Sequence, residues 1–170
     1  PSNNSSNLNF VFISTNAGLG TFSDQFHIIA TNTLANFNRT TSIVDVTMFV
    51  VSMQLSTTNI PTNIVRGYST TTTFDFWNSG GGEVNYTVTS TVPWLLVYPT
   101  SGIVTGETTD ATNTITVTIT NTLDLPVGAT NGNIILTETF DGASYTVNVS
   151  LVVNPQPSMA VTPSFITNTI

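Results

Sequence analysis

The sequence predicts an all-β protein that folds as an antiparallel β-sandwich. Apolar and polar residues alternate with a period of two along much of the chain, whereas helical periodicity is almost missing. The alternating runs are separated by Gly, Pro and Asn at a spacing of roughly 8–12 residues, as in sandwich folds. Charged residues make up only 6% of the chain. Thr, Ser and Asn take their place, which is typical of a β-rich surface.

The clearest strands follow one another in chain order. A strand is expected over 70–78 and the next over 83–91, and the glycine stretch 79–82 between them has the composition of a hairpin turn. Two further strands are expected over 113–121 and 145–153. Alternation predicts that these strands turn the following residues toward the core: Phe76, Ile115, Val117, Ile119, Val147, Val149, Leu151 and Val153.

The segment 92–98 contains Trp94, one of two tryptophans. Trp94 and Leu96 share one face of this segment, and Leu95 and Val97 share the other. A run that is apolar on both faces is usually buried. Trp94 is therefore predicted to fill the core rather than to stack against a ligand.

An internal repeat is the most informative feature of the chain. The segment that starts at Met53 resembles the segment that starts at Met159, with Ile60 matching Ile166 and Ile64 matching Ile170. Three further pairs recur in the same order: 9–16 with 114–121, 18–31 with 126–137, and 43–51 with 146–153. Their separation of about 106 residues is the length of one immunoglobulin-like sandwich.

The repeat predicts one complete unit flanked by partial units. Residues 52–153 form the complete immunoglobulin-like sandwich, 1–51 are the C-terminal half of another unit, and 154–170 are the first strand of a following one. Two explanations fit a chain that begins and ends within a repeat unit. The chain is a window from a long tandem array, an interpretation that its start at Pro1 also favours. Alternatively, the half-unit of one chain is completed by strand addition from a neighbour, and this head-to-tail pairing yields a fibre.

Composition excludes several classes of partner and chemistry. The net charge is −7, and Arg39 and Arg66 are the only strong cations. Nucleic acids and anionic membrane surfaces are therefore poor partners. The absence of lysine and cysteine excludes Schiff-base chemistry, Lys–Asn isopeptide crosslinks, disulfides and thiolate metal sites. The chain has no apolar run of about 18 residues, so its sequence predicts no membrane-inserted helix.

The central unit resembles the BACON family of immunoglobulin-like modules. The resemblance covers about 52–153 and rests on Trp94–Leu95, the turn Pro99–Gly102, the strand Ile115–Ile119, Gly128, and the segments Ile134–Thr137 and Val147–Val153. Members of that family occur as tandem spacers in cell-surface and phage proteins, and the family name supposes carbohydrate binding. The resemblance therefore implies an extracellular, non-enzymatic module.

Assembly is the first functional prediction: a non-enzymatic structural subunit of an extracellular fibre or surface stalk, whose partners are copies of itself or neighbouring repeats. The predicted assembly strand carries Met159, Val161, Phe165 and Ile166. The predicted acceptor residues are Phe10, Phe12, Phe26, Ile28 and Val46.

The alternative prediction is a carbohydrate-binding adhesin or spacer domain. Its candidate residues are Trp77, which alternation places opposite the inward Phe76, together with Tyr86 and Tyr98. Five Asn-x-Ser/Thr acceptors suit an extracellular glycoprotein: Asn3, Asn4, Asn38, Asn85 and Asn148.

Nothing in the sequence predicts an enzyme, a cofactor or a metal site. His27 is the one histidine, and it is expected to face solvent in an alternating strand. The nine carboxylates are scattered. Glu107 with Asp110 in one loop, or Asp124 after it, offers oxygen ligands for calcium, but the Asp-x-Asp-x-Asp spacing is absent.

Overall fold

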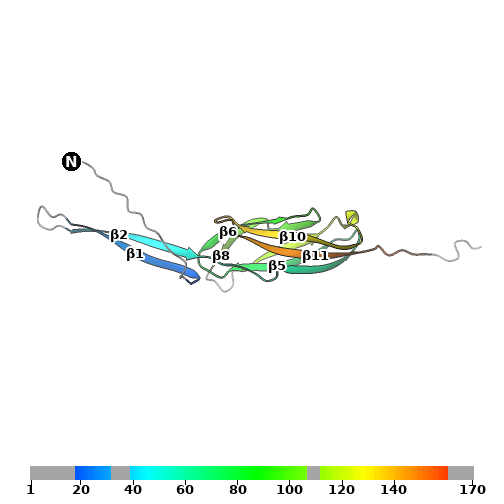
Figure 1. Ribbon diagram of the computed structural model, residues 1–170, viewed down its shortest axis with the longest axis horizontal. Coiled ribbons are helices and arrows are strands. Elements are labelled where there is room, and N and C mark those ends of the chain that lie inside the picture. Colours follow the sequence, from blue (N-terminus) through cyan, green and yellow to red (C-terminus); the bar gives the residue numbers. More distant parts are fainter. Residues whose placement is uncertain (1–17, 32–38, 107–111, 161–170) are drawn as a thin grey trace, which may run out of the picture. The chain divides into compact units, whose positions relative to one another are not determined.

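A computed structural model describes residues 18–31, 39–106 and 112–160, which form eleven strands and one short 3-10 helix (Figure 1). The strands are β1 Gly20–Thr31, β2 Arg39–Val50, β3 Met53–Leu55, β4 Asn59–Val65, β5 Thr70–Asn78, β6 Glu83–Ser90, β7 Leu95–Tyr98, β8 Ser101–Thr105, β9 Asn113–Ile119, β10 Gly128–Glu138 and β11 Ser144–Asn154. The 3-10 helix is η1 Thr122–Asp124. Among these residues no helix is long and apolar enough to cross a membrane.

The strands build a sandwich of two sheets and a separate two-stranded ribbon. One sheet has five strands in the order β4-β11-β10-β6-β8, and the other has four in the order β3-β5-β9-β7. The ribbon consists of β1 and β2. The predicted all-β, immunoglobulin-like sandwich is confirmed. It is not antiparallel throughout, because β4 pairs with β11 in parallel.

The core follows the alternation seen in the sequence. On β9 the side chains of Ile115, Val117 and Ile119 are fully buried, while the threonines between them are half-buried. On β11 the four predicted inward residues, from Val147 to Val153, are all buried. Phe76, which lies on β5 in the opposite sheet, is 0% exposed. These burials confirm that period-2 patterning identifies the core face of each strand.

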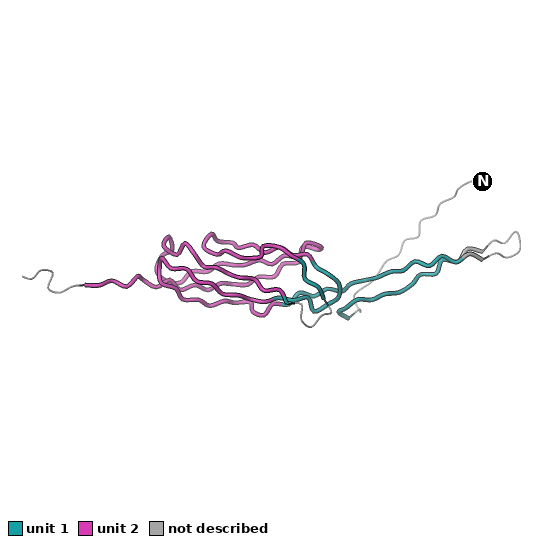
Figure 2. The backbone as a smooth tube through the Cα atoms, turned by 180° about the vertical axis from the view of Figure 1, so that it is seen from behind, with its two compact units in different colours: residues 1–54, 76–84, 103–112 teal, residues 55–75, 85–102, 113–170 magenta. Residues whose placement is uncertain are grey.

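The chain divides into two compact units (Figure 2). Unit 1 comprises 1–54, 76–84 and 103–112, and unit 2 comprises 55–75, 85–102 and 113–170. The ribbon β1–β2 therefore groups with short segments from the ends of β5, β6 and β8, a grouping that the sequence repeat does not anticipate. The predicted division of the chain at 51/52 and 153/154 stays a prediction. The first boundary lies between the end of β2 at Val50 and the start of β3 at Met53.

The glycine stretch after β5 is not a hairpin turn, so that prediction is wrong. β5 lies in the four-stranded sheet and the following β6 in the five-stranded sheet. The stretch from Ser79 to Gly82 therefore links two sheets instead of joining two paired strands. Its glycines allow a close approach of other backbone segments.

Candidate assembly site

The ribbon β1–β2 is a regular antiparallel hairpin whose register runs from Gly20 opposite Val50 to Thr31 opposite Arg39. Within the described residues, each of its strands pairs only with the other. The outer edge of β2 therefore presents backbone N–H and C=O groups that no described strand satisfies, although Val50 O at the end of β2 accepts from Gly81 N–H. An edge of this kind is a template for strand addition.

One face of the hairpin is mainly apolar. Cross-strand partners share a face of a sheet, and the pairs Phe22–Met48 and Phe26–Val44 lie on the same face as Val46. Phe22 is 41% and Val44 42% exposed, whereas Phe26, Val46 and Met48 are half-buried. A hollow on this face is lined by Phe22, Phe26, Val46 and Met48, and also by Ser23 and Asp24. Core-type residues thus stand partly open to solvent.

The opposite face of the hairpin is polar along its middle. Gln25 and Asp45 are direct cross-strand partners, and Gln25 Nε2 donates to Asp45 Oδ1 over 2.8 Å. The hydroxyls of Ser23 and Thr47 lie 3.4 Å apart on the same face. His27 is exposed, as the sequence predicts. Beyond its middle this face also carries the exposed apolar side chains Ile29, Ile43 and Phe49. The face with Phe22, Phe26 and Val46 has more apolar residues, and it is the one that a second layer of the sandwich would cover.

The hairpin repeats the geometry of β10–β11 in the sandwich. β10 begins at Gly128, which has φ 120° and pairs with Val153 near the end of β11. β1 begins at Gly20, which has φ 134° and pairs with Val50 at the end of β2. These φ values are ones that glycine adopts without strain. The two hairpins therefore share their starting glycine and its cross-strand partner.

This correspondence aligns β2 with β11 residue by residue. With Val50 placed over Val153, Val46 lies over Val149 and Met48 over Leu151. On β11 these residues are fully buried, because the opposite sheet covers them and β4 pairs with the strand edge. On β2 the equivalent residues are half-buried. The hairpin has the core face of a sandwich without the strand that β4 supplies.

The base of the hairpin is held by the glycine stretch after β5. Gly81 N–H donates to Val50 O over 3.0 Å, and Ser79 N–H donates to Ser52 O over 2.8 Å. A Cβ at Gly80 would lie 2.1 Å from Val50 O, and one at Gly82 would lie 2.7 Å from the ring of Phe49. Gly80 thus packs against backbone, whereas Gly82 packs against a side chain and has a φ of 71°, which also favours glycine.

Asn78 connects the same turn to the chain that follows the hairpin. Its side chain is 3% exposed. Its Oδ1 accepts from Ser52 N over 3.0 Å and from Gly80 N over 2.9 Å, and its Nδ2 donates to Gly81 O over 3.2 Å. One buried amide thus satisfies backbone groups on both segments. The sequence reasoning missed Asn78, although an Asn directly before a Ser-Gly-Gly stretch is a turn signal.

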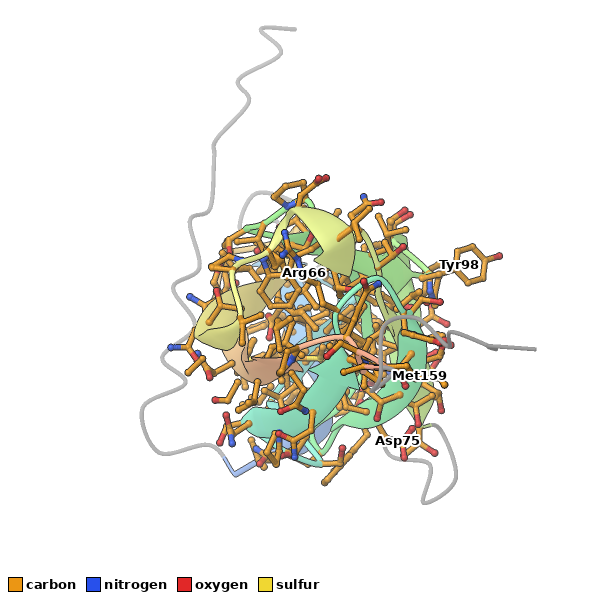
Figure 3. The ribbon with its side chains drawn as sticks, turned by 90° about the vertical axis from the view of Figure 1, so that its right-hand side faces the viewer. Arg66, Asp75, Tyr98 and Met159 are labelled. Carbon is orange, nitrogen blue, oxygen red and sulfur yellow. The ribbon has the colours of Figure 1, made fainter. Side chains whose placement is uncertain are left out.

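The structure describes only part of the predicted assembly residues. Met159 is 96% exposed at the end of the described tail and is labelled in Figure 3. Ile28 is 37% exposed on the apolar face of the hairpin, where Phe26 and Val46 also lie. Phe22, Val44 and Met48 belong to the same face but are not among the predicted acceptor residues. The remaining assembly residues lie outside the described residues: Phe10, Phe12, Val161, Phe165 and Ile166.

The predicted sugar-binding residues do not share one environment. Tyr98 is 75% exposed and its ring projects away from the ribbon in Figure 3. Trp77 is half-buried. Tyr86 is 3% exposed, and burial raises the pKa of its hydroxyl above the ordinary value. The prediction of Tyr86 as a surface contact is wrong, because Val84, Tyr86 and Val88 form one inward-facing row on β6.

Trp94 is part of the core, as predicted. It is 5% exposed, and the neighbouring Leu95 is 1% exposed. Gly132 packs against both, since a Cβ there would lie 2.8 Å from Leu95 Cδ1 and 3.1 Å from Trp94 Cζ2. The tryptophan therefore stabilises the sandwich and presents no open ring face.

Glu138 is the buried carboxylate of the described chain, with an exposed fraction of 2%. Tyr145 donates its hydroxyl proton to Glu138 Oε1 over 3.0 Å. Burial raises the pKa of Glu138, the hydrogen bond from Tyr145 lowers it, and the charge of Asp141 raises it further, with a net upward shift. No described group of three or more His, Cys, Asp or Glu side chains is arranged to hold a metal ion.

Two of the predicted glycosylation acceptors lie in described strands. Asn85 is exposed on β6. Asn148 is half-buried on β11, where its Nδ2 donates to Asn133 Oδ1 over 3.1 Å and its Oδ1 accepts from Ser150. Asn3, Asn4 and Asn38 lie outside the described residues, as do the calcium candidates Glu107 and Asp110. Glycosylation at these positions stays a prediction.

No protein-family model matches the chain, and no curated protein matches it significantly. Among solved structures, it is similar to the ASH/PapD-like domain of human CEP192, with 11% identity and a TM-score of 0.49 over 62% of this chain and 87% of that chain. The E. coli chaperone DraB is 16% identical with a TM-score of 0.46, over 62% of this chain and 55% of that chain. A Porphyromonas gingivalis W83 protein of unknown function is 14% identical with a TM-score of 0.47, over 81% of this chain and 67% of that chain. At these identities and scores the similarities carry no assignment of function.

Proposed function

We propose that the protein is a non-enzymatic structural subunit of an extracellular fibre or surface stalk, and that its chains are joined by β-strand complementation. In this account the hairpin β1–β2 is an incomplete sandwich half, and a strand from a neighbouring chain completes it. The partners are therefore further copies of the same chain. The BACON resemblance of the central unit is compatible with this role but stays a prediction.

One observation carries the proposal. The hairpin β1–β2 has the same starting glycine, cross-strand pairing and apolar face as β10–β11, yet no described strand occupies the edge that β4 occupies on β11. An apolar face and an open edge on one ribbon are costly to leave in water. Covering both by one added segment removes the two costs together.

The chain itself contains a segment with the required sequence. Residues 159–170 repeat residues 53–64, and Ile60 and Ile64 of that stretch are 7% and 6% exposed on β4. Their counterparts are Ile166 and Ile170. A neighbour that donates 159–170 presents apolar residues at the positions where the sandwich uses them. Because donor and acceptor are different surfaces, the contact is heterologous and propagates into a filament.

The test compares the 170-residue chain with a chain that lacks 159–170. The shorter chain keeps all described strands and also Gln156, whose side chain lies beside Gly67. Both are examined by negative-stain electron microscopy and sedimentation velocity at matched concentrations, after circular dichroism has verified a folded sandwich. We expect filaments or a concentration-dependent series of oligomers for the full chain and a monomer for the shortened chain.

Two outcomes would overturn the proposal. A full chain that remains monomeric at all concentrations would remove its basis, because the hairpin would then need no partner. Filaments that persist without 159–170 would show that another surface joins the subunits.

Binding of polysaccharide is the alternative proposal. Exposure of the Tyr98 ring supports it, since open aromatic faces stack on sugars. It predicts a change in tryptophan fluorescence with a glycan, and a binding signal that Trp77→Ala or Tyr98→Ala reduces. Binding that is unaffected by both substitutions would exclude these residues from the sugar contact.

A further inference from the structure

We infer that residues 166–170 of one chain pair in parallel with β2 of another, in the register in which β4 pairs with β11. This inference rests on the proposed function and deepens it, because it specifies the direction, the edge and the residue pairs of the contact. The occupant of the apolar hairpin face is therefore a defined segment of a second copy of this chain.

The β4–β11 ladder supplies the template. Ile60 lies beside Val149 and Ile64 beside Val153, and the intervening residues follow in parallel. All four of these side chains are buried, so the ladder joins two apolar rows on the same face of the sheet. A shift of one residue would turn the apolar row of the added strand to solvent.

The two sequence correspondences transfer this register to the contact between chains. Val46 and Val50 on β2 correspond to Val149 and Val153 on β11. Ile166 and Ile170 stand for Ile60 and Ile64. The expected neighbours are therefore Ile166 with Val46 and Ile170 with Val50.

The segment preceding β4 shows how the rest of the tail would be used. β3 lies in the four-stranded sheet and β4 in the five-stranded sheet, so this stretch of chain passes from one layer of the sandwich to the other. Met53 at the start of β3 is 3% exposed. Met159 is its counterpart, and its side chain is 96% exposed. A tail that follows the same path places Met159 over the apolar face of the hairpin and the isoleucines at its edge.

Engineered cysteines test the register without interference, because the chain has no cysteine of its own. The polar face of the hairpin offers sites that leave the apolar contact intact. Ser150 lies beside Pro61 in the template, so Thr47 is expected beside Thr167. Thr47 is exposed. Neighbouring strands lie about 4.8 Å apart, within the Cα separation that a disulfide bridges.

The experiment mixes two full-length single-cysteine chains, Thr47→Cys and Thr167→Cys, under mild oxidation. Only a contact between chains produces a species of twice the chain mass in this mixture. The matched control replaces Thr167→Cys by Thr169→Cys, which keeps the side chain on the same face but moves it two residues along the strand. We expect at least about fivefold more crosslinked dimer for the Thr47–Thr167 pair, since the shifted pair exceeds the separation that a disulfide spans.

A calibration variant, Val152→Cys with Asn63→Cys, places cysteines on a pair that the structure defines on the outer face of β11 and β4. If this variant crosslinks and filaments form, but Thr47–Thr167 gives no more dimer than Thr47–Thr169, the register is wrong and the assembly proposal stands. If the calibration succeeds and the chain neither assembles nor crosslinks between copies, both are overturned. A disulfide within one chain of the double variant Thr47→Cys/Thr167→Cys, with no dimer from the mixture, would also overturn the inference.

Discussion

Gly81 and Gly20 lie in contact: a Cβ added to Gly81 would come within 2.3 Å of the carbonyl carbon of Gly20 and 2.6 Å of Thr21 N. Gly20 is the residue at which the exposed hairpin begins, and Gly81 belongs to the turn after β5. The nearest neighbours of Gly81 are backbone atoms, which cannot move aside as a flexible side chain would. This close approach fixes the base from which the hairpin extends.

The substitution Gly81→Ala is therefore expected to loosen the hairpin. Forcing a methyl group into this contact should lower the free energy of unfolding by about 1–3 kcal/mol. Urea denaturation followed by tryptophan fluorescence measures the loss, and limited proteolysis should show faster cleavage within 20–50. Gly18→Ala is the matched control, because a Cβ at Gly18 meets nothing within 4 Å. Equal stability of the two variants would contradict the described packing.

Asn78 provides a second test of the hairpin base. Asn78→Ala removes the acceptor of the Ser52 and Gly80 amides and leaves those N–H groups buried or half-buried. We expect a loss of about 2 kcal/mol in the free energy of unfolding, because unsatisfied amides keep their desolvation cost. Asn131→Ala, at an exposed position of β10, should change stability by less than about 0.5 kcal/mol. The prediction fails if Asn78→Ala is as stable as that control.

Glu138 predicts a pH dependence of stability. Its pKa is raised in the folded protein above the ordinary value of 4.5, so the folded chain holds this proton more tightly than the unfolded chain. Its contribution to stability is therefore complete at pH values below 4.5 and is lost as pH rises through the folded pKa. Glu138→Gln keeps an acceptor for the Tyr145 hydroxyl and has no charge to lose. Thermal unfolding at a series of pH values should show that the variant gains stability relative to the parent as pH rises. A constant difference between the two proteins across that range would argue against a shifted Glu138.

Trp94 and Trp77 should respond differently to truncation. Trp94 is 5% exposed in the core, and Trp94→Ala is expected to lower the free energy of unfolding by about 3–5 kcal/mol. Trp77 is half-buried, so Trp77→Ala should cost less. Each variant retains one tryptophan whose fluorescence reports urea unfolding. If Trp77→Ala were the more damaging change, the assignment of Trp94 to the core would be untenable.

Much of the sandwich follows from local pattern. Strict alternation identifies Ile115, Val117 and Ile119 as core, and the apolar run around Trp94 indicates burial without any tertiary information. The same signal is present for Tyr86, which stands between Val84 and Val88 in one alternating row. The alternating row predicts that Tyr86 is buried, whereas the aromatic ring taken alone suggests a sugar contact, and the structure agrees with the row.

Other features depend on partners that are distant in sequence. A glycine turn between two strands does not reveal whether they pair with each other, so the link between β5 and β6 has the composition of a hairpin although the strands belong to different sheets. The parallel pairing of β4 with β11 likewise has no local signature, although Pro61 in β4 is consistent with an edge strand. The apolar hairpin face is only partly predictable, because Asp24 interrupts the alternation between Phe22 and Phe26.

The most direct measurement of strand complementation adds the tail back as a separate molecule. A synthetic peptide of residues 159–170 is titrated into the ¹⁵N-labelled chain that lacks this segment, and amide chemical shifts are recorded. Strand complementation predicts saturable shifts concentrated on β2, and no such shifts with a peptide carrying Ile166→Asp and Ile170→Asp. A folded chain whose β2 amides do not respond to millimolar peptide, or respond equally to both peptides, would contradict the proposal that this segment completes the hairpin.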